Sequence, residues 1–181
     1  MRLFTGLKIP PRIADQLDAL RGKLHGGRWI EREAYHITLS FIGEVEGRAI
    51  DEICQALATV KARPFTLQLR AMGCFGSSRP RALYAGVSPS DELTTLQGAQ
   101  ARAITNTGIE LEKRKYRPHV TLARFKSKSR NDAGKFIARN NLFRSDEFEV
   151  SGFVLFSARP SGGGGPYAIE DEFAFTGQAG F

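Results

Sequence analysis

The stretches His36-Ile37-Thr38-Leu39 and His119-Val120-Thr121-Leu122 share one pattern, a histidine and a threonine two positions apart in an apolar, β-branched run. Successive side chains of a strand point to opposite faces, so each histidine should lie on the same face as its threonine. The apolar residue after each of them should turn the other way. Two of the three histidines in the chain fall in this pattern. It predicts a symmetric active site with one imidazole from each half.

The two tetrapeptides lie 83 residues apart, and the segments around them predict a duplicated unit. Each half is predicted to contain, in chain order, a strand, a helix, the strand with the histidine motif, a second helix and a last strand. The predicted strands outside the motifs span about 2–7, 65–69, 81–87 and 148–156, and the predicted helices span about 11–24, 47–61, 90–106 and 131–140. Ser90, followed by two acidic residues, is expected to cap the third helix.

From this order we expect an α+β fold formed by a single domain, residues 1–181. Its two lobes, approximately the sequence repeats 1–80 and 81–181, should be related by a pseudo-twofold axis. Antiparallel sheets should line a central cleft, with the helices outside. The Gly162–Gly165 run is expected to form a flexible loop at the rim of that cleft.

The bulk composition favours an anionic partner. Lys and Arg exceed Asp and Glu by 26 to 19, giving a net charge of +7, which suits phosphate or RNA. Cys54 and Cys74 form neither a disulfide framework nor a metal-ligand spacing. No signal peptide is evident, and no apolar run approaches the roughly 18 residues that span a bilayer. We therefore expect a cytoplasmic monomer with no membrane contact and no obligate protein partner.

Two histidines and two threonines suit acid–base chemistry at phosphorus. A neutral and a protonated imidazole form a matched base and acid, because the pKa of histidine lies nearest neutral pH. Threonine hydroxyls can donate hydrogen bonds to phosphate oxygens. His and Thr alone make a poor metal site, so no metal or cofactor is expected. A cyclic phosphodiester fits this set, because it carries its own leaving group and needs only water.

The chain resembles the 2H phosphoesterase superfamily, and within it the bacterial and archaeal RNA 2′,3′-cyclic phosphodiesterases, also called 2′-5′ RNA ligases. The supporting strings are Arg2-Leu3-Phe4, His36 to Gly43, and Arg117-Pro118-His119-Val120-Thr121-Leu122-Ala123-Arg124. The resemblance implies hydrolysis of an RNA-terminal 2′,3′-cyclic phosphate to a 2′-phosphate, with a bilobal α+β fold.

By the same resemblance, His36 would be the proton donor to the departing 3′ oxygen and His119 the proton acceptor that activates water. Thr38 and Thr121 would bind the phosphate. The sequence alone does not orient acid and base, because the two motifs are nearly identical.

Three residues beside the motifs are further candidates. Many relatives carry a basic residue at the position of Ser40, which we expect on the face of His36 and Thr38. Arg124 is a candidate phosphate ligand, although alternation places it on the face opposite His119. Phe41 is expected to pack in the core, with base stacking as the alternative.

Other residues receive structural interpretations. His25, Tyr84 and Tyr167 are expected to be structural or solvated, with a minor role in the site open to the two tyrosines. The basic residues of 113–117, with Lys126, Lys128 and Arg130, could steer an RNA backbone.

Three other functions remain open. The same histidines could join a 2′,3′-cyclic phosphate to a 5′-hydroxyl, the reaction run backwards. The chain could instead be a non-catalytic RNA-binding module, or it could act on small cyclic nucleotides rather than RNA.

Overall fold

The computed structural model describes residues 1–76, 78–126, 131–158 and 165–177, and its elements follow the predicted order with two additions. The strands are β1 (Arg2–Lys8), β2 (Gly27–Trp29), β3 (His36–Glu44), β4 (Phe65–Phe75), β5 (Ala82–Val87), β6 (His119–Phe125), β7 (Arg144–Val150), β8 (Gly152–Ala158) and β9 (Tyr167–Ala174). The helices are α1 (Pro11–Asp18), α2 (Arg48–Ala58), α3 (Asp91–Thr105) and α4 (Ala133–Asn140), with a 3₁₀ turn at Arg32–Ala34. The α+β class is confirmed.

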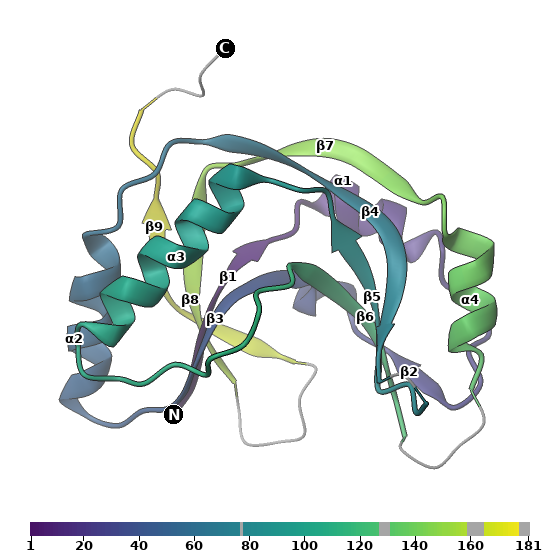
Figure 1. The fold of residues 1–181 in the computed structure, drawn as a ribbon, viewed down its shortest axis with the longest axis horizontal. Helices are drawn as coiled ribbons and strands as arrows, with labels where there is room; N and C mark the ends of the chain where they lie inside the picture. Colours follow the sequence, from purple (N-terminus) through teal and green to yellow (C-terminus); the bar gives the residue numbers. More distant parts are fainter. Residues whose placement is uncertain (77, 127–130, 159–164, 178–181) are drawn as a thin grey trace.

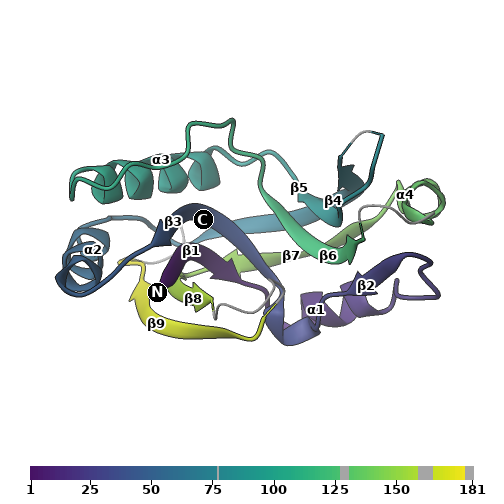
Figure 2. The ribbon, with the colours of Figure 1, turned by 90° about the horizontal axis from the view of Figure 1, so that it is seen from below.

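The strands form one antiparallel sheet in the order β7-β4-β5-β6-β3-β1-β8-β9, with β2 paired to β6 (Figure 1). The two histidine strands, β3 and β6, meet at the middle of this order. Helices α2 and α3 lie side by side at one end of the molecule, and α4 and α1 lie toward the other (Figures 1 and 2).

The two halves of the sheet each take strands from both halves of the chain. β4 comes from the first half of the chain but pairs with β5 and β7, whereas β8 comes from the second half and pairs with β1. One large hydrophobic cluster takes residues from both halves of the sheet. The duplication inferred from the sequence stays a prediction.

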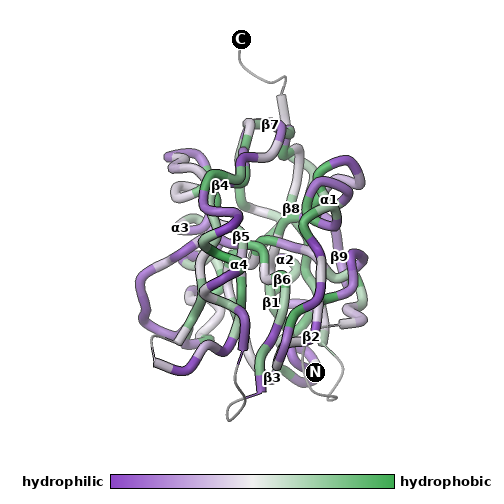
Figure 3. The backbone as a smooth tube through the Cα atoms, turned by 90° about the vertical axis from the view of Figure 1, so that its right-hand side faces the viewer, coloured by the Kyte–Doolittle hydropathy of each residue, from purple (hydrophilic) through white to green (hydrophobic). Residues whose placement is uncertain are grey.

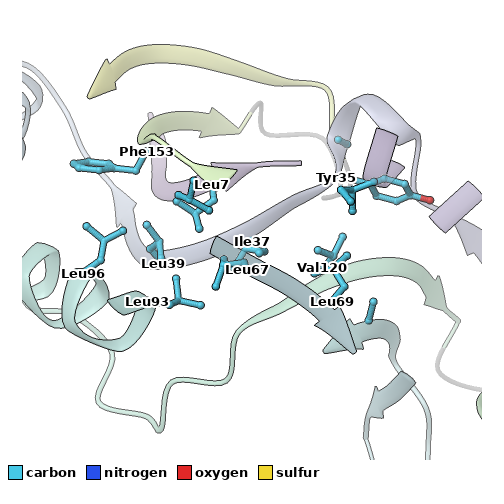
Figure 4. Close-up of a cluster of buried hydrophobic side chains, with 14 of the residues drawn as sticks. Leu7, Tyr35, Ile37, Leu39, Leu67, Leu69, Leu93, Leu96, Val120 and Phe153 are labelled. Atoms are coloured by element: carbon cyan, nitrogen blue, oxygen red, sulfur yellow. The ribbon is translucent and has the colours of Figure 1, made fainter. Parts of the chain in front are cut away.

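That cluster lies on the face of β3 and β6 opposite the histidines. Ile37 and Val120 are fully buried members of it, and Leu93 and Leu96 of α3 belong to the same cluster (Figure 4). Strands with green, hydrophobic positions run through the interior in Figure 3, while polar segments lie outside. Among the described helices, none is long and apolar enough to span a bilayer.

Three predicted elements have clearly different bounds. The strand expected at 65–69 is longer, because β4 continues to Phe75. The first helix ends at Asp18 instead of Leu24, because Leu20 and Arg21 form tighter three-residue turns. Arg21 then turns inward to donate hydrogen bonds to Tyr35 Oη, at 2.8 Å from Nη2. The predicted strand 148–156 is two strands, broken at Ser151. The Ser90 cap of α3 is confirmed, since its Oγ accepts a hydrogen bond from Leu93 N at 3.1 Å.

Candidate active site

A single pair of residues joins the two histidine strands. Ile37 of β3 lies opposite Val120 of β6 in antiparallel pairing, and both side chains are fully buried. Because strand side chains alternate, the residues on either side of this pair turn to the opposite face of the sheet. These residues are His36, Thr38, His119 and Thr121, all of them partly exposed. We call this side of β3 and β6 the histidine face.

A β-bulge at Leu39 changes which residue follows Thr38 onto the histidine face. In the pairing with β1, Gly6 lies opposite Thr38 and Thr5 opposite Ser40, so Leu39 is the extra residue. An extra residue reverses the alternation beyond it. Ser40 is therefore buried, with 6% of its surface exposed, and the expectation that it lies on the histidine face is wrong.

The same bulge exposes Phe41, which was expected to pack in the core. Its side chain is 49% exposed, and its ring lies 6.0 Å from that of Phe4, which itself lies 4.9 Å from the ring of His36. Core packing of Phe41 is thus wrong, and the ring is available beside the histidine face.

Strand β6 has a matching bulge at Leu122. Tyr84 of β5 lies opposite Thr121 and Leu83 opposite Ala123, so Leu122 is the extra residue. Arg124 is exposed as a result and joins the histidine face, against the expectation from strict alternation. Since 83 residues separate the motifs, Phe41 and Arg124 occupy equivalent positions in the two strands.

His36 lies in an aromatic surrounding. Its ring centroid is 4.9 Å from Phe4, 5.1 Å from Tyr167 and 5.8 Å from Phe156. Burial, assisted by the charges of His119 and Arg124 and opposed by the hydrogen bond to Ala34, lowers the pKa of His36 to about 4. The imidazole is therefore neutral at neutral pH when the site is empty.

The hydrogen bonds of His36 fix its tautomer. Nδ1 lies 2.8 Å from the carbonyl oxygen of Ala34, which can only accept, so Nδ1 carries the proton. Nε2 then accepts a hydrogen bond from Thr38 Oγ1 at 3.1 Å. Nε2 is the nitrogen left for chemistry on the histidine face.

His119 has the same tautomer in a more cationic surrounding. Its Nδ1 donates to the carbonyl oxygen of Arg117 at 2.7 Å, and its ring lies 4.7 Å from Phe75 and 5.3 Å from Tyr84. Burial lowers the pKa of His119, and the charges of three arginines lower it further. These arginines are Arg114, Arg117 and Arg124.

A hydrogen bond joins the segment before β6 to strand β3. Tyr116 Oη donates a hydrogen bond to the carbonyl oxygen of Thr38 at 3.1 Å, and burial raises the pKa of this phenol. The guanidinium of Arg114 lies 5.7 Å from the ring centre of Phe41, and that of Arg117 lies 6.0 Å from Phe75. The basic segment 113–117 therefore borders His119, and its Tyr116 contacts the backbone of the His36 strand.

Of the remaining candidates from the sequence, the two tyrosines lie at the histidine rings and His25 does not. Tyr84 and Tyr167 pack directly on the histidine rings. His25 is structural, since its Nδ1 lies 2.7 Å from Asp132 Oδ2 near α4. Lys128, Arg130 and most of the Gly162–Gly165 run fall outside the described residues. In the part of the chain that is described, no group of three His, Cys, Asp or Glu side chains is placed to hold a metal ion.

Comparison with known families places the chain among phosphoesterases. A family profile described as "LigT like Phosphoesterase" matches residues 7–84 and 86–167. The RNA 2′,3′-cyclic phosphodiesterase of Aquifex aeolicus is 30% identical over 185 residues, and the match covers 98% of each protein.

Two relatives of the same name match over shorter stretches. The Aeropyrum pernix protein is 40% identical over 99 residues, which cover 54% of this chain and 56% of that relative. The match to the Geobacillus stearothermophilus protein spans 32% of its length. Among solved structures, Escherichia coli LigT complexed with 3′-AMP has a TM-score of 0.78 at 22% identity, covering 97% of this chain and 98% of that one. This last likeness shows a shared fold.

Proposed function

Because the chain belongs to the LigT-like phosphoesterase family, we propose that it hydrolyses RNA-terminal 2′,3′-cyclic phosphate to a 2′-phosphomonoester. The observation that carries the proposal is the single Ile37–Val120 pair. It turns two imidazoles and two threonine hydroxyls to one face of the sheet, where one phosphate can meet all four. The name shared by the curated relatives supports this substrate.

Each histidine would move one proton through Nε2. His119 Nε2 takes a proton from water as its oxygen attacks phosphorus, and the bond from phosphorus to O3′ breaks. His36 Nε2 gives a proton to O3′, leaving the phosphate on O2′. Exchange with solvent then returns both imidazoles to their starting states.

The phosphate would be held by hydroxyls and one guanidinium. Thr38, Thr121 and Arg124 share the face of the histidines. Donors aimed at the non-bridging oxygens stabilise the charge that grows in the transition state. Arg124 lowers the pKa of both histidines, which is consistent with a position beside both.

The acid role of His36 depends on substrate. Burial holds the imidazole neutral in the empty site, but a bound phosphate anion favours the charged form and raises its pKa. Substrate binding would therefore supply the protonated acid where it is needed. Such coupling protects the empty site from carrying a buried cation.

Phosphorus-31 NMR of an oligonucleotide ending in 2′,3′-cyclic phosphate tests the proposal. The protein should convert it to a 2′-phosphate, and His36→Ala and His119→Ala should not. A 3′-phosphate product would overturn the assigned bond cleavage. Binding without turnover would instead favour a non-catalytic RNA-binding module. Added 5′-hydroxyl oligonucleotide would reveal ligation as a new 2′-5′ phosphodiester signal.

The same assay tests the role of metal. Proton transfer by two imidazoles needs no Lewis acid, so EDTA should leave the rate unchanged. Loss of turnover in EDTA, with recovery on adding a divalent ion, would contradict the mechanism.

A further inference from the structure

A second arginine lies beside Arg124 on a strand that the sequence reading did not foresee. The short strand β2 pairs with β6 so that Arg28 lies directly opposite Arg124, flanked by Gly27 opposite Phe125 and Trp29 opposite Ala123. Directly opposed residues of an antiparallel pair point to the same face. Arg28 therefore extends the histidine face beyond Arg124.

The neighbours of Arg28 confirm this orientation. Trp29 turns inward, with Nε1 donating to the carbonyl oxygen of Gly22 at 3.0 Å and the ring 5.4 Å from Phe136 of α4. A side chain at Gly27 would collide with Phe125, which is 8% exposed. Since residues on either side of Arg28 face the interior, its own side chain faces outward, where it is exposed.

This pair of like charges is not compensated within the described residues. Neither guanidinium forms an ion pair or hydrogen bond with another described side chain, whereas Arg12, Arg21 and Arg32 each pair with an aspartate. Like charges directly opposite each other destabilise a sheet. An anionic ligand lying across both would relieve this repulsion.

We propose that Arg28 binds the phosphodiester immediately 5′ of the terminal nucleotide, which makes the protein selective for oligonucleotide ends over mononucleotides. This inference rests on the proposed function, with Arg124 on the reacting phosphate. Arg28 stands one strand farther out, directly opposite Arg124, so it can bind a second phosphate when Arg124 holds the reacting one. A guanidinium suits this role because its planar fork binds phosphate oxygens in pairs.

The matched substrates are adenylyl-adenosine 2′,3′-cyclic phosphate and adenosine 2′,3′-cyclic phosphate, which differ by one internal phosphodiester. For Arg28→Gln, kcat/KM on the dinucleotide should fall roughly tenfold or more, as expected for a lost charge-assisted hydrogen bond. The mononucleotide should be turned over as by the unmodified protein. Arg139→Gln removes an exposed charge on α4 and should change neither.

Binding of the two 2′-phosphate products, measured in parallel, separates this proposal from the proposed function. Arg28→Gln should weaken binding of the dinucleotide product only, and should reduce the slope of log affinity against log salt by about 0.7, one phosphate contact. Equal losses on both ligands, or no loss on either, would overturn the role of Arg28. Absence of turnover by the unmodified protein, with selective binding lost in Arg28→Gln, would overturn the hydrolase proposal alone.

Discussion

The two histidine strands carry the same pattern, yet their surroundings differ. On β3, three aromatic rings pack against His36, and the position after the bulge is Phe41. On β6, two aromatic rings pack against His119, but the charges of three arginines also act on it, and the equivalent position is Arg124. One half of the site is therefore apolar and the other cationic.

This difference separates two roles that the motifs alone leave equivalent. The cationic half suits the phosphate and the attacking water, because burial and positive charge together lower the pKa of His119 and leave it able to accept a proton. The apolar half suits the base and the departing 3′ oxygen. Changes in the two halves should therefore have different effects.

Removing either imidazole should abolish most of the rate. His36→Gln and His119→Gln should each lower kcat about 10²- to 10⁴-fold, the usual range for a lost proton transfer. His25→Gln is the control and should keep full activity, because that histidine lies outside the site. If only one of the two catalytic variants loses activity, the other imidazole is structural and the comparison fails.

The equivalent positions after the two bulges should respond unequally, with the greater loss at Arg124. Arg124→Gln should lower kcat/KM about 10²- to 10³-fold, as for removal of one oxyanion donor. It should also raise the pKa of both histidines, since its charge lowers both. Histidine titration by NMR, read alongside the kinetics, checks both effects. Unchanged titrations would place Arg124 away from the imidazoles.

Acid should destabilise the protein through His36. Its pKa is lowered to about 4 in the folded state, whereas the unfolded chain binds the proton near pH 6.5. The contribution of neutral His36 to the free energy of unfolding is therefore fully present at pH 7. It is lost as the pH falls from about 6.5 to 4, which lowers the free energy of unfolding by up to about 3 kcal/mol.

Urea unfolding at pH 7 and pH 4.5 measures how far the free energy of unfolding decreases in acid. The decrease should be smaller for His36→Gln than for the unmodified protein. Inorganic phosphate should also reduce it, because the anion favours the protonated imidazole. An equal loss in the variant would show that His36 is not held neutral by burial.

The smallest effect is expected at Phe41. Phe41→Leu should raise KM roughly fivefold with kcat unchanged, at the low end of base–aromatic stacking. The protein should remain folded, because the ring is half exposed. Steady-state kinetics on an oligonucleotide ending in 2′,3′-cyclic phosphate measures KM and kcat separately. A fall in kcat with KM unchanged would give Phe41 a role in the chemistry.

The histidine pattern was readable from the sequence because alternation in a strand is a local property. The paired placement of His36 with Thr38 and of His119 with Thr121 needed only that rule. The bulges at Leu39 and Leu122 can be recognised only from the pairing of β3 with β1 and of β6 with β5. Strict alternation therefore predicts the wrong face for both Ser40 and Arg124.

Long-range pairing also explains the elements that sequence reading missed. β2 is three residues long and exists as a strand because it pairs with β6, and it supplies Arg28. β9 forms against β8 and supplies Tyr167, which packs on His36. Helix α1 ends at Asp18, and Arg21 beyond it donates a hydrogen bond to Tyr35, a contact that the spacing of apolar residues does not reveal.

A substrate with sulfur in place of the 3′ bridging oxygen tests the division of roles most directly. A thiolate leaves without being protonated, so the acid becomes dispensable while the base does not. The account predicts that His36→Ala cleaves this substrate at nearly the unmodified rate, whereas His119→Ala remains about 10²-fold or more slower. The reverse result would exchange the two roles, and equal losses would contradict an acid–base pair divided between the apolar and cationic halves.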